Sequence, residues 1–179
     1  MVSHDALSLD SEMLVEAKAY LRLEPDQNDS SLSAILLAAL NHAEGFTGQT
    51  LLQRDVREIR NVSSVWQRLA ATPVVGFTSV TGIPAEGANF VLPAISYSTE
   101  IDHHGEGQFR ITQPGSAGRV EIVYQAGLVA DWGELPEALR LGILRLVGYF
   151  HMNRDAVDDS GPPVAVSAFL LPWRRIRLP

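Results

Sequence analysis

The densest group of side chains that could do chemistry occupies seven consecutive positions in the middle of the chain. It consists of three carboxylates and two imidazoles: Glu100, Asp102, His103, His104 and Glu106. Both side-chain types are metal ligands, so the group could in principle bind a metal ion. Adjacent side chains on a strand point to opposite faces, however, so His103 and His104 cannot easily reach one ion. Because Gly105 and Gly107 favour a tight turn, we expect a polar hairpin tip here.

A second candidate is a polar stretch that partly mimics a calcium-binding loop. Asp26, Asn28 and Ser30 have the spacing of the first three ligands of such a loop. The mimicry ends there, because Ser31 replaces the required glycine and Leu37 occupies the position of the bidentate acid. We therefore interpret this stretch as a loop that caps the following helix.

The sequence carries no motif for catalysis. It contains no cysteine, which excludes thiol nucleophiles, disulfides, thiolate zinc sites and iron–sulfur clusters. GxSxG, P-loop and GxGxxG patterns are absent, and His42 and His151 have plain interpretations as boundary and helix-terminal residues. Catalytic triads assemble across a fold, so the missing motifs remove positive evidence for an enzyme without excluding one. The residues by themselves therefore identify no catalytic residue, metal site or cofactor site.

The composition is that of a globular protein. The 179 residues are 46% hydrophobic and 20% charged, which is enough to bury a core. A net charge of −7 makes the chain a poor candidate for gripping DNA or an anionic membrane. No apolar run is long enough for a membrane span, and acids near the N-terminus stand where a signal peptide carries positive charge. We therefore expect an intracellular protein without a membrane span.

The charge is unevenly distributed along the chain. The first 50 residues have a net charge of −6, whereas the last 16 have a net charge of +3. The basic end also contains six bulky apolar residues: Phe169, Leu170, Leu171, Trp173, Ile176 and Leu178. Aromatic residues and arginine together are typical of interface hot spots. The C-terminal segment is therefore either a frayed terminus or a surface that binds a partner.

Hydrophobic periodicity predicts helices at both ends of the chain. Residues 11–22 form one helix with Asp10 or Ser11 as its N-cap, and residues 31–47 carry one long apolar stripe. The short polar loop between them predicts an antiparallel helical hairpin. Residues 136–153 predict a third helix with apolar surface on two sides. Such a helix either lies in a core or is shared with a neighbouring subunit.

The ends of these helices have sequence signals of their own. Gly48 stands where a C-terminal capping glycine is typical, and Pro136 suits the first position of the third helix. Residues 154–163 predict a proline-stiffened linker. Residues 164–171 predict a short helix that ends before Pro172.

The region between the helices is rich in β-branched residues and turn signals. It predicts antiparallel strands at four places: 77–83, 94–101, 108–112 and 120–125. The fold class is therefore α+β, with about three long helices, a β-rich insertion between the second and third of them, and a C-terminal tail. We expect a single domain with four parts: a helical hairpin at 1–50, the β insertion at 51–130, the third long helix at 131–155, and the linker and tail at 156–179.

An ordered set of short elements resembles one known family. The set runs along nearly the whole chain: 16–22 (EAKAYLR), 26–29, 44–48 (EGFTG), 77–81, 120–127 (VEIVYQAG), 135–140, 148–154 and 171–174 (LPWR). No single element is diagnostic, but their order is fairly specific. The chain in this respect resembles the head–tail connector, or adaptor, proteins of tailed phages and of phage-like gene transfer agents. Stoppers and tail terminators are less similar, because they are largely β.

The resemblance implies a structural adaptor and not an enzyme. Such proteins form a ring below the portal, usually with its twelvefold symmetry, in the neck of a particle assembled in the bacterial cytoplasm. The ring extends the DNA channel and receives the next connector or the tail, while DNA passes without specific binding. A metal-dependent enzyme that uses Glu100, His103 and His104, or a generic interaction module, remains the alternative.

The resemblance also implies two interfaces. In relatives the C-terminal segment reaches towards the portal, which suggests these portal contacts: Phe169, Leu170, Leu171, Trp173, Arg174, Arg175 and Arg177. The two-sided third helix suggests these contacts between neighbouring subunits: Arg140, Leu141, Leu144 and Arg145. The resemblance assigns no counterpart to the tip at 102–107, so the loop that meets the downstream connector stays open.

Overall fold

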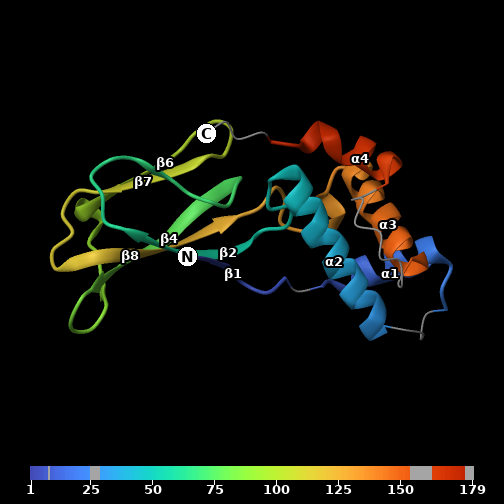
Figure 1. Cartoon of the computed structure of the whole chain (residues 1–179), viewed down its shortest axis with the longest axis horizontal. Coiled ribbons are helices and arrows are strands. Elements are labelled where there is room, and N and C mark those ends of the chain that lie inside the picture. Colours follow the sequence, from blue (N-terminus) through green and yellow to red (C-terminus); the bar gives the residue numbers. More distant parts are fainter. Residues whose placement is uncertain (8, 25–28, 154–162, 176–179) are drawn as a thin grey trace. The chain divides into compact units, whose positions relative to one another are not determined.

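The computed structural model describes residues 1–7, 9–24, 29–153 and 163–175 (Figure 1). The chain divides into two compact units that interleave in sequence. One unit contains Met1–Ala6 and Leu52–Leu128 and is built from strands, and the other contains Leu7–Leu51 and Val129–Pro179 and is built from helices. In the described part of the chain, no helix is both long and apolar enough to span a membrane.

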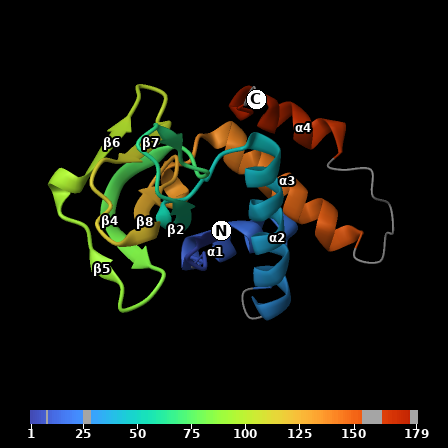
Figure 2. The same ribbon diagram turned by 60° about the vertical axis from the view of Figure 1, so that its left-hand side comes forward.

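The strand unit contains two antiparallel sheets among its described residues. The larger sheet has the strand order β1 (Val2–His4), β2 (Arg54–Asn61), β8 (Ala117–Ala126), β4 (Val74–Pro84) and β5 (Phe90–Val91). The smaller sheet has the order β3 (Gln67–Arg68), β7 (Gly107–Ile111) and β6 (Tyr97–Ile101). Figure 2 shows β6 and β7 forming a separate layer beside β4 and β8.

One hydrophobic core joins the two sheets of this unit. Alternate residues of β8 point into it, with Val120, Ile122 and Tyr124 fully buried. The smaller sheet contributes Phe109 and Ile111 from β7. Period-two alternation of this kind places one face of each sheet on the core.

The helical unit packs four helices among the described residues: α1 (Ser11–Leu21), α2 (Asp29–Thr47), α3 (Glu137–Met152) and α4 (Val164–Leu170). A single turn, η2 (Trp132–Glu134), precedes α3, and another, η3 (Leu171–Trp173), follows α4. Helix α3 contacts each of the other three helices, and Figure 1 shows α4 along one side of it. The apolar stripe of α3 is buried accordingly, with Leu139, Ile143 and Leu146 at 0% exposure.

The structure confirms the α+β class with antiparallel sheets, and it confirms several local signals. The Asp10 side chain caps α1 by accepting a hydrogen bond from the backbone N–H of Glu12. Gly48 follows α2 with φ at +68°, and its N–H donates to the Glu44 carbonyl at 2.8 Å. A left-handed conformation of this kind favours glycine.

Three details differ from the sequence prediction. Pro136 is the N-cap of α3 and not its first helical residue, because its ψ of 131° is not helical. Residues 94–96 form a single 3₁₀ turn (η1, Ala94–Ser96), so the strand predicted at 94–101 begins only at Tyr97. Strands β1, β2, β3 and β5 were not predicted, because β2 carries charged residues on both faces and the other three are only two or three residues long.

Candidate functional site

The C-terminal segment, residues 164–175, is seated on the helices of its own unit. Val166 and Leu170 of α4 are buried, at 3% and 0% exposure. Gly142 of α3 lies directly beneath α4, since a Cβ at position 142 would come within 2.9 Å of the Phe169 Cβ. A glycine there lets the backbones of α3 and α4 approach closely, so these two helices form a tight pair.

The end of the segment rests on a short element that we name the α2 cradle, residues Phe46, Thr47, Gly48 and Gln49. The Arg175 N–H donates to the Thr47 carbonyl at 2.7 Å, and the Gln49 Nε2 donates to the Trp173 carbonyl. The Arg174 guanidinium lies over the Phe46 ring, 5.4 Å from its centroid. Gly48 makes room for this packing, because a Cβ there would lie 3.2 Å from the Arg175 carbonyl oxygen.

The residues predicted as portal contacts therefore divide by exposure. Leu170 is fully buried, and Phe169 is half-buried beneath the Arg145 guanidinium, which lies 4.7 Å from its ring centroid. Leu171 is 55% exposed, and Arg174 is exposed as well. Trp173 and Arg175 are half-buried, and Arg177 lies outside the described residues.

The residues predicted as subunit contacts also have partners within their own unit. Arg140 pairs with the Glu16 carboxylate at 3.3 Å, and the same carboxylate accepts a 2.6 Å hydrogen bond from the Trp132 indole. Leu144 is buried at 4% exposure, whereas Leu141 is half-buried. Arg140 therefore ties α3 to α1, as Arg145 ties α3 to α4.

The predicted hairpin tip is present between β6 and β7. The Asp102 carboxylate accepts hydrogen bonds from the backbone N–H groups of His104 and Glu106, both at 2.8 Å. These bonds, chiefly the one from Glu106, lower the pKa of Asp102 below its usual value. Within the described ranges, no group of three His, Cys, Asp or Glu side chains is placed to hold a metal ion. The arrangement at this tip is that of a turn.

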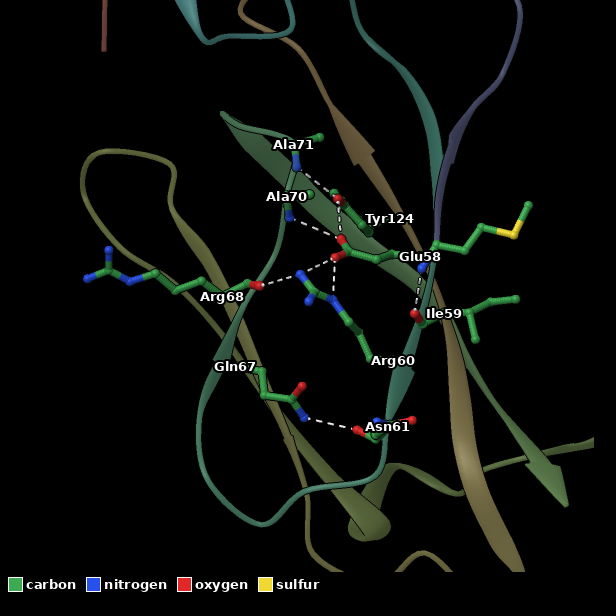
Figure 3. A network of polar contacts seen from close by, with 10 residues as sticks. Glu58, Ile59, Arg60, Asn61, Gln67, Arg68, Ala70, Ala71 and Tyr124 are labelled. Atoms are coloured by element: carbon green, nitrogen blue, oxygen red, sulfur yellow. Dashed lines mark hydrogen bonds and ion pairs between the residues drawn. The ribbon is translucent and has the colours of Figure 1, made fainter. Parts of the chain in front are cut away.

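The strand unit contains one buried polar network, which no sequence pattern predicts (Figure 3). The Glu58 side chain has 0% exposure. It accepts hydrogen bonds from Arg60, from the Ala70 N–H at 3.0 Å and from the Tyr124 hydroxyl at 3.0 Å. The Tyr124 hydroxyl in turn accepts from the Ala71 N–H at 3.1 Å. Burial raises the pKa of this hydroxyl, so it stays protonated and donates to Glu58.

This network fastens the chain before β4 to strands β2 and β8. Both carboxylate oxygens of Glu58 have partners, and no group in the network is left to act on a substrate. Its chemistry is therefore that of a structural anchor. No local sequence pattern predicts this network, because Glu58 and Tyr124 are 66 residues apart.

The α+β chain, with one strand unit and one helical unit, is similar in fold to chains in three structures of gene transfer agent (GTA) particles. One is the neck of an empty GTA particle with C6 symmetry, at a TM-score of 0.78 and 23% identity, covering 99% of this chain and 97% of that one. No protein-family model and no curated protein sequence matches the chain.

The other two structures are of native particles. The virion of the native GTA particle matches with a TM-score of 0.76, and its neck with C12 symmetry matches with a TM-score of 0.74. Each shares 24% identity with this chain and covers 99% of it, and 97% of the matched chain is covered. The resemblance inferred from the order of sequence elements is thereby confirmed at the level of the fold.

Proposed function

We propose that this chain is a structural head–tail adaptor of a tailed phage or of a gene transfer agent, and not an enzyme. The observation that carries the proposal is the likeness to particle-neck chains over the whole length of both partners. A likeness confined to one unit would support only a shared module. Here one match covers 99% of this chain, so it includes both the strand unit and the helical unit.

The adaptor forms a ring below the portal, in the neck of a particle whose parts are made in the bacterial cytoplasm. The C6 and C12 symmetries of the similar necks support a ring, and twelve copies is the number that fits both. Its subunit is a bundle of three long helices, α1, α2 and α3, with the β-rich region inserted between α2 and α3, apart from β1, which joins that region from the N-terminus. This is a single connector domain, closed by a C-terminal tail.

The portal-facing surface is the exposed side of the C-terminal segment. Leu171, Trp173 and Arg174 combine apolar area with a positive charge, as interface hot spots do. Buried Leu170 and half-buried Phe169 hold this surface on α3 and contribute through its position.

Neighbouring subunits meet at α3. A ring needs two different complementary faces on each copy, and α3 offers Leu141 and Arg145 beyond its own core. Arg140 and Leu144 support this face from inside the unit.

The ring continues the DNA channel towards the next connector. A net charge of −7 suits a wall along which DNA slides, because counterion release by a basic wall would make DNA adhere. DNA is accordingly a passing cargo and not a specific ligand.

The test is native mass spectrometry of the chain alone and with the portal ring of its own particle. Twelve copies per portal ring are expected. The double variant Leu171→Ala/Arg174→Ala should bind the portal weakly, and Val164→Ala is its matched control, since Val164 is 87% exposed on the same segment. A chain that stays monomeric and does not bind the portal would refute the proposal.

A further inference from the structure

The α2 cradle has no role in the proposed function so far, yet it holds the residues that carry that function. Its four consecutive residues make four different interactions with 173–175: a ring contact, a backbone hydrogen bond, a close backbone approach and a side-chain hydrogen bond. Gln49 is 7% exposed and donates across 124 positions of sequence to the Trp173 carbonyl. A terminus that merely frays would not have such specific partners.

These contacts fix the backbone on both sides of Arg174. The Trp173 carbonyl and the Arg175 N–H are both bonded to the cradle, so the backbone between them has little freedom. The Arg174 side chain stacks on Phe46, and within the described residues no carboxylate pairs with it. The guanidinium is thus positioned with its charge still available to a partner.

Ordering a flexible segment on binding costs conformational entropy and weakens affinity. A segment that is already held in its bound conformation avoids this cost, because its rotamers and backbone are fixed before the encounter. Contacts with a surface of the same subunit, such as the α2 cradle, can fix a segment in this way before it binds.

We infer that the α2 cradle preorganises the C-terminal segment for the portal, so that Leu171, Trp173 and Arg174 dock as a preformed element. This inference rests on the proposed function. The partner surface it requires is an apolar recess for Leu171 and Trp173 with a carboxylate at its rim for Arg174. Gln49 and Phe46 are positioning residues, because they act through the segment and need not touch the portal.

The experiment compares the variants Gln49→Ala and Phe46→Leu with the control Gln113→Ala, which removes an exposed glutamine of the strand unit. Hydrogen exchange of the Arg175 amide reports docking on the cradle, and titration with the portal ring reports affinity. Exchange at Arg175 should accelerate in both cradle variants. The portal Kd should rise about fivefold in Gln49→Ala, the equivalent of one net hydrogen bond. Gln113→Ala should change neither quantity.

Two results would overturn the inference. In the first, exchange accelerates in the cradle variants while portal affinity stays unchanged or increases, which would show that docking on the cradle is irrelevant or inhibitory. In the second, the cradle variants leave exchange at Arg175 unchanged. The proposed function is judged separately by Leu171→Ala/Arg174→Ala: if that variant binds the portal weakly while the cradle variants bind normally, only the inference fails. If it binds normally too, the portal surface itself is wrong.

Discussion

Two helical glycines provide a sharp test of how the C-terminal segment is seated. Gly142 lies in α3 under α4, where an added Cβ would stand 2.9 Å from the Phe169 Cβ and 3.3 Å from the Leu170 Cδ2. Gly45 lies in α2, where an added Cβ would meet nothing within 4 Å. Replacing either glycine by alanine brings the same helical gain, about 1 kcal/mol. The two variants therefore differ only in the contact with α4.

The size of that difference follows from the geometry. The Phe169 Cβ is attached to the backbone of α4, so it can retreat only if the helix moves. Overpacking of this kind costs about 1–3 kcal/mol. Gly45→Ala should stabilise the protein by about 1 kcal/mol, and Gly142→Ala should be less stable than Gly45→Ala by about 2 kcal/mol. At this chain length the two melting temperatures should differ by roughly 4–8 °C.

The assay is thermal unfolding followed by circular dichroism at the helical band, together with limited proteolysis of the C-terminal segment. Compared with the unsubstituted protein, Gly142→Ala should melt at a lower temperature, and protease should remove its C-terminal segment faster. Gly45→Ala should show neither change. If Gly142→Ala gained stability to the same extent as Gly45→Ala, α4 would not be packed on Gly142. The described packing of the C-terminal segment on α3 would then be refuted.

Three further outcomes follow from the strand unit. Glu58→Gln places an amide donor against either Arg60 or the Ala70 N–H, so urea unfolding should show a loss of about 2–3 kcal/mol; a loss below about 0.5 kcal/mol would show that the network is not a structural anchor. Gly127→Ala puts a Cβ 2.4 Å from the Gln53 backbone at a φ of +156°, and should cost about 3 kcal/mol or more, while Gly118→Ala, which meets nothing within 4 Å, should be near neutral. Because the pKa of Asp102 is lowered, its carboxylate stabilises the hairpin tip at every pH above the ordinary pKa of 3.8. This stabilisation is lost only as the pH falls through the lower pKa of the folded state. A carboxyl titration by NMR with a midpoint at or above 3.8 would contradict this.

The cradle gives a physical meaning to one of the sequence elements on which the resemblance depends. The sequence assigns Gly48 of the run Glu44–Gly48 to the end of a helix, and otherwise the run counts only as part of an ordered pattern. In the structure its Phe46, Thr47 and Gly48 receive the C-terminal segment, and the following Gln49 completes the contact. Two elements of the pattern that are far apart in sequence, 44–48 and 171–174, thus belong to one contact.

The sequence by itself determined the elements whose cause is local. The helices at 11–22, 31–47 and 136–153 were predicted within two residues of their ends, because apolar spacing, a capping Asp10 and a left-handed Gly48 act within a few residues. The turn around Asp102 was predicted for the same reason.

Only the tertiary structure decided what depends on distant partners. Strand β2 was not predicted, because its inward Glu58 breaks the apolar alternation and is stabilised by Tyr124, which is 66 residues away. Composition left the C-terminal segment as either a frayed terminus or a partner surface, and it could not separate the buried Leu170 from the exposed Leu171 next to it. Burial of a side chain depends on which element packs over it, and the cradle at Gln49 is 124 positions from the carbonyl it holds. The hydrophobic periodicity of a short stretch of sequence does not reveal such distant contacts.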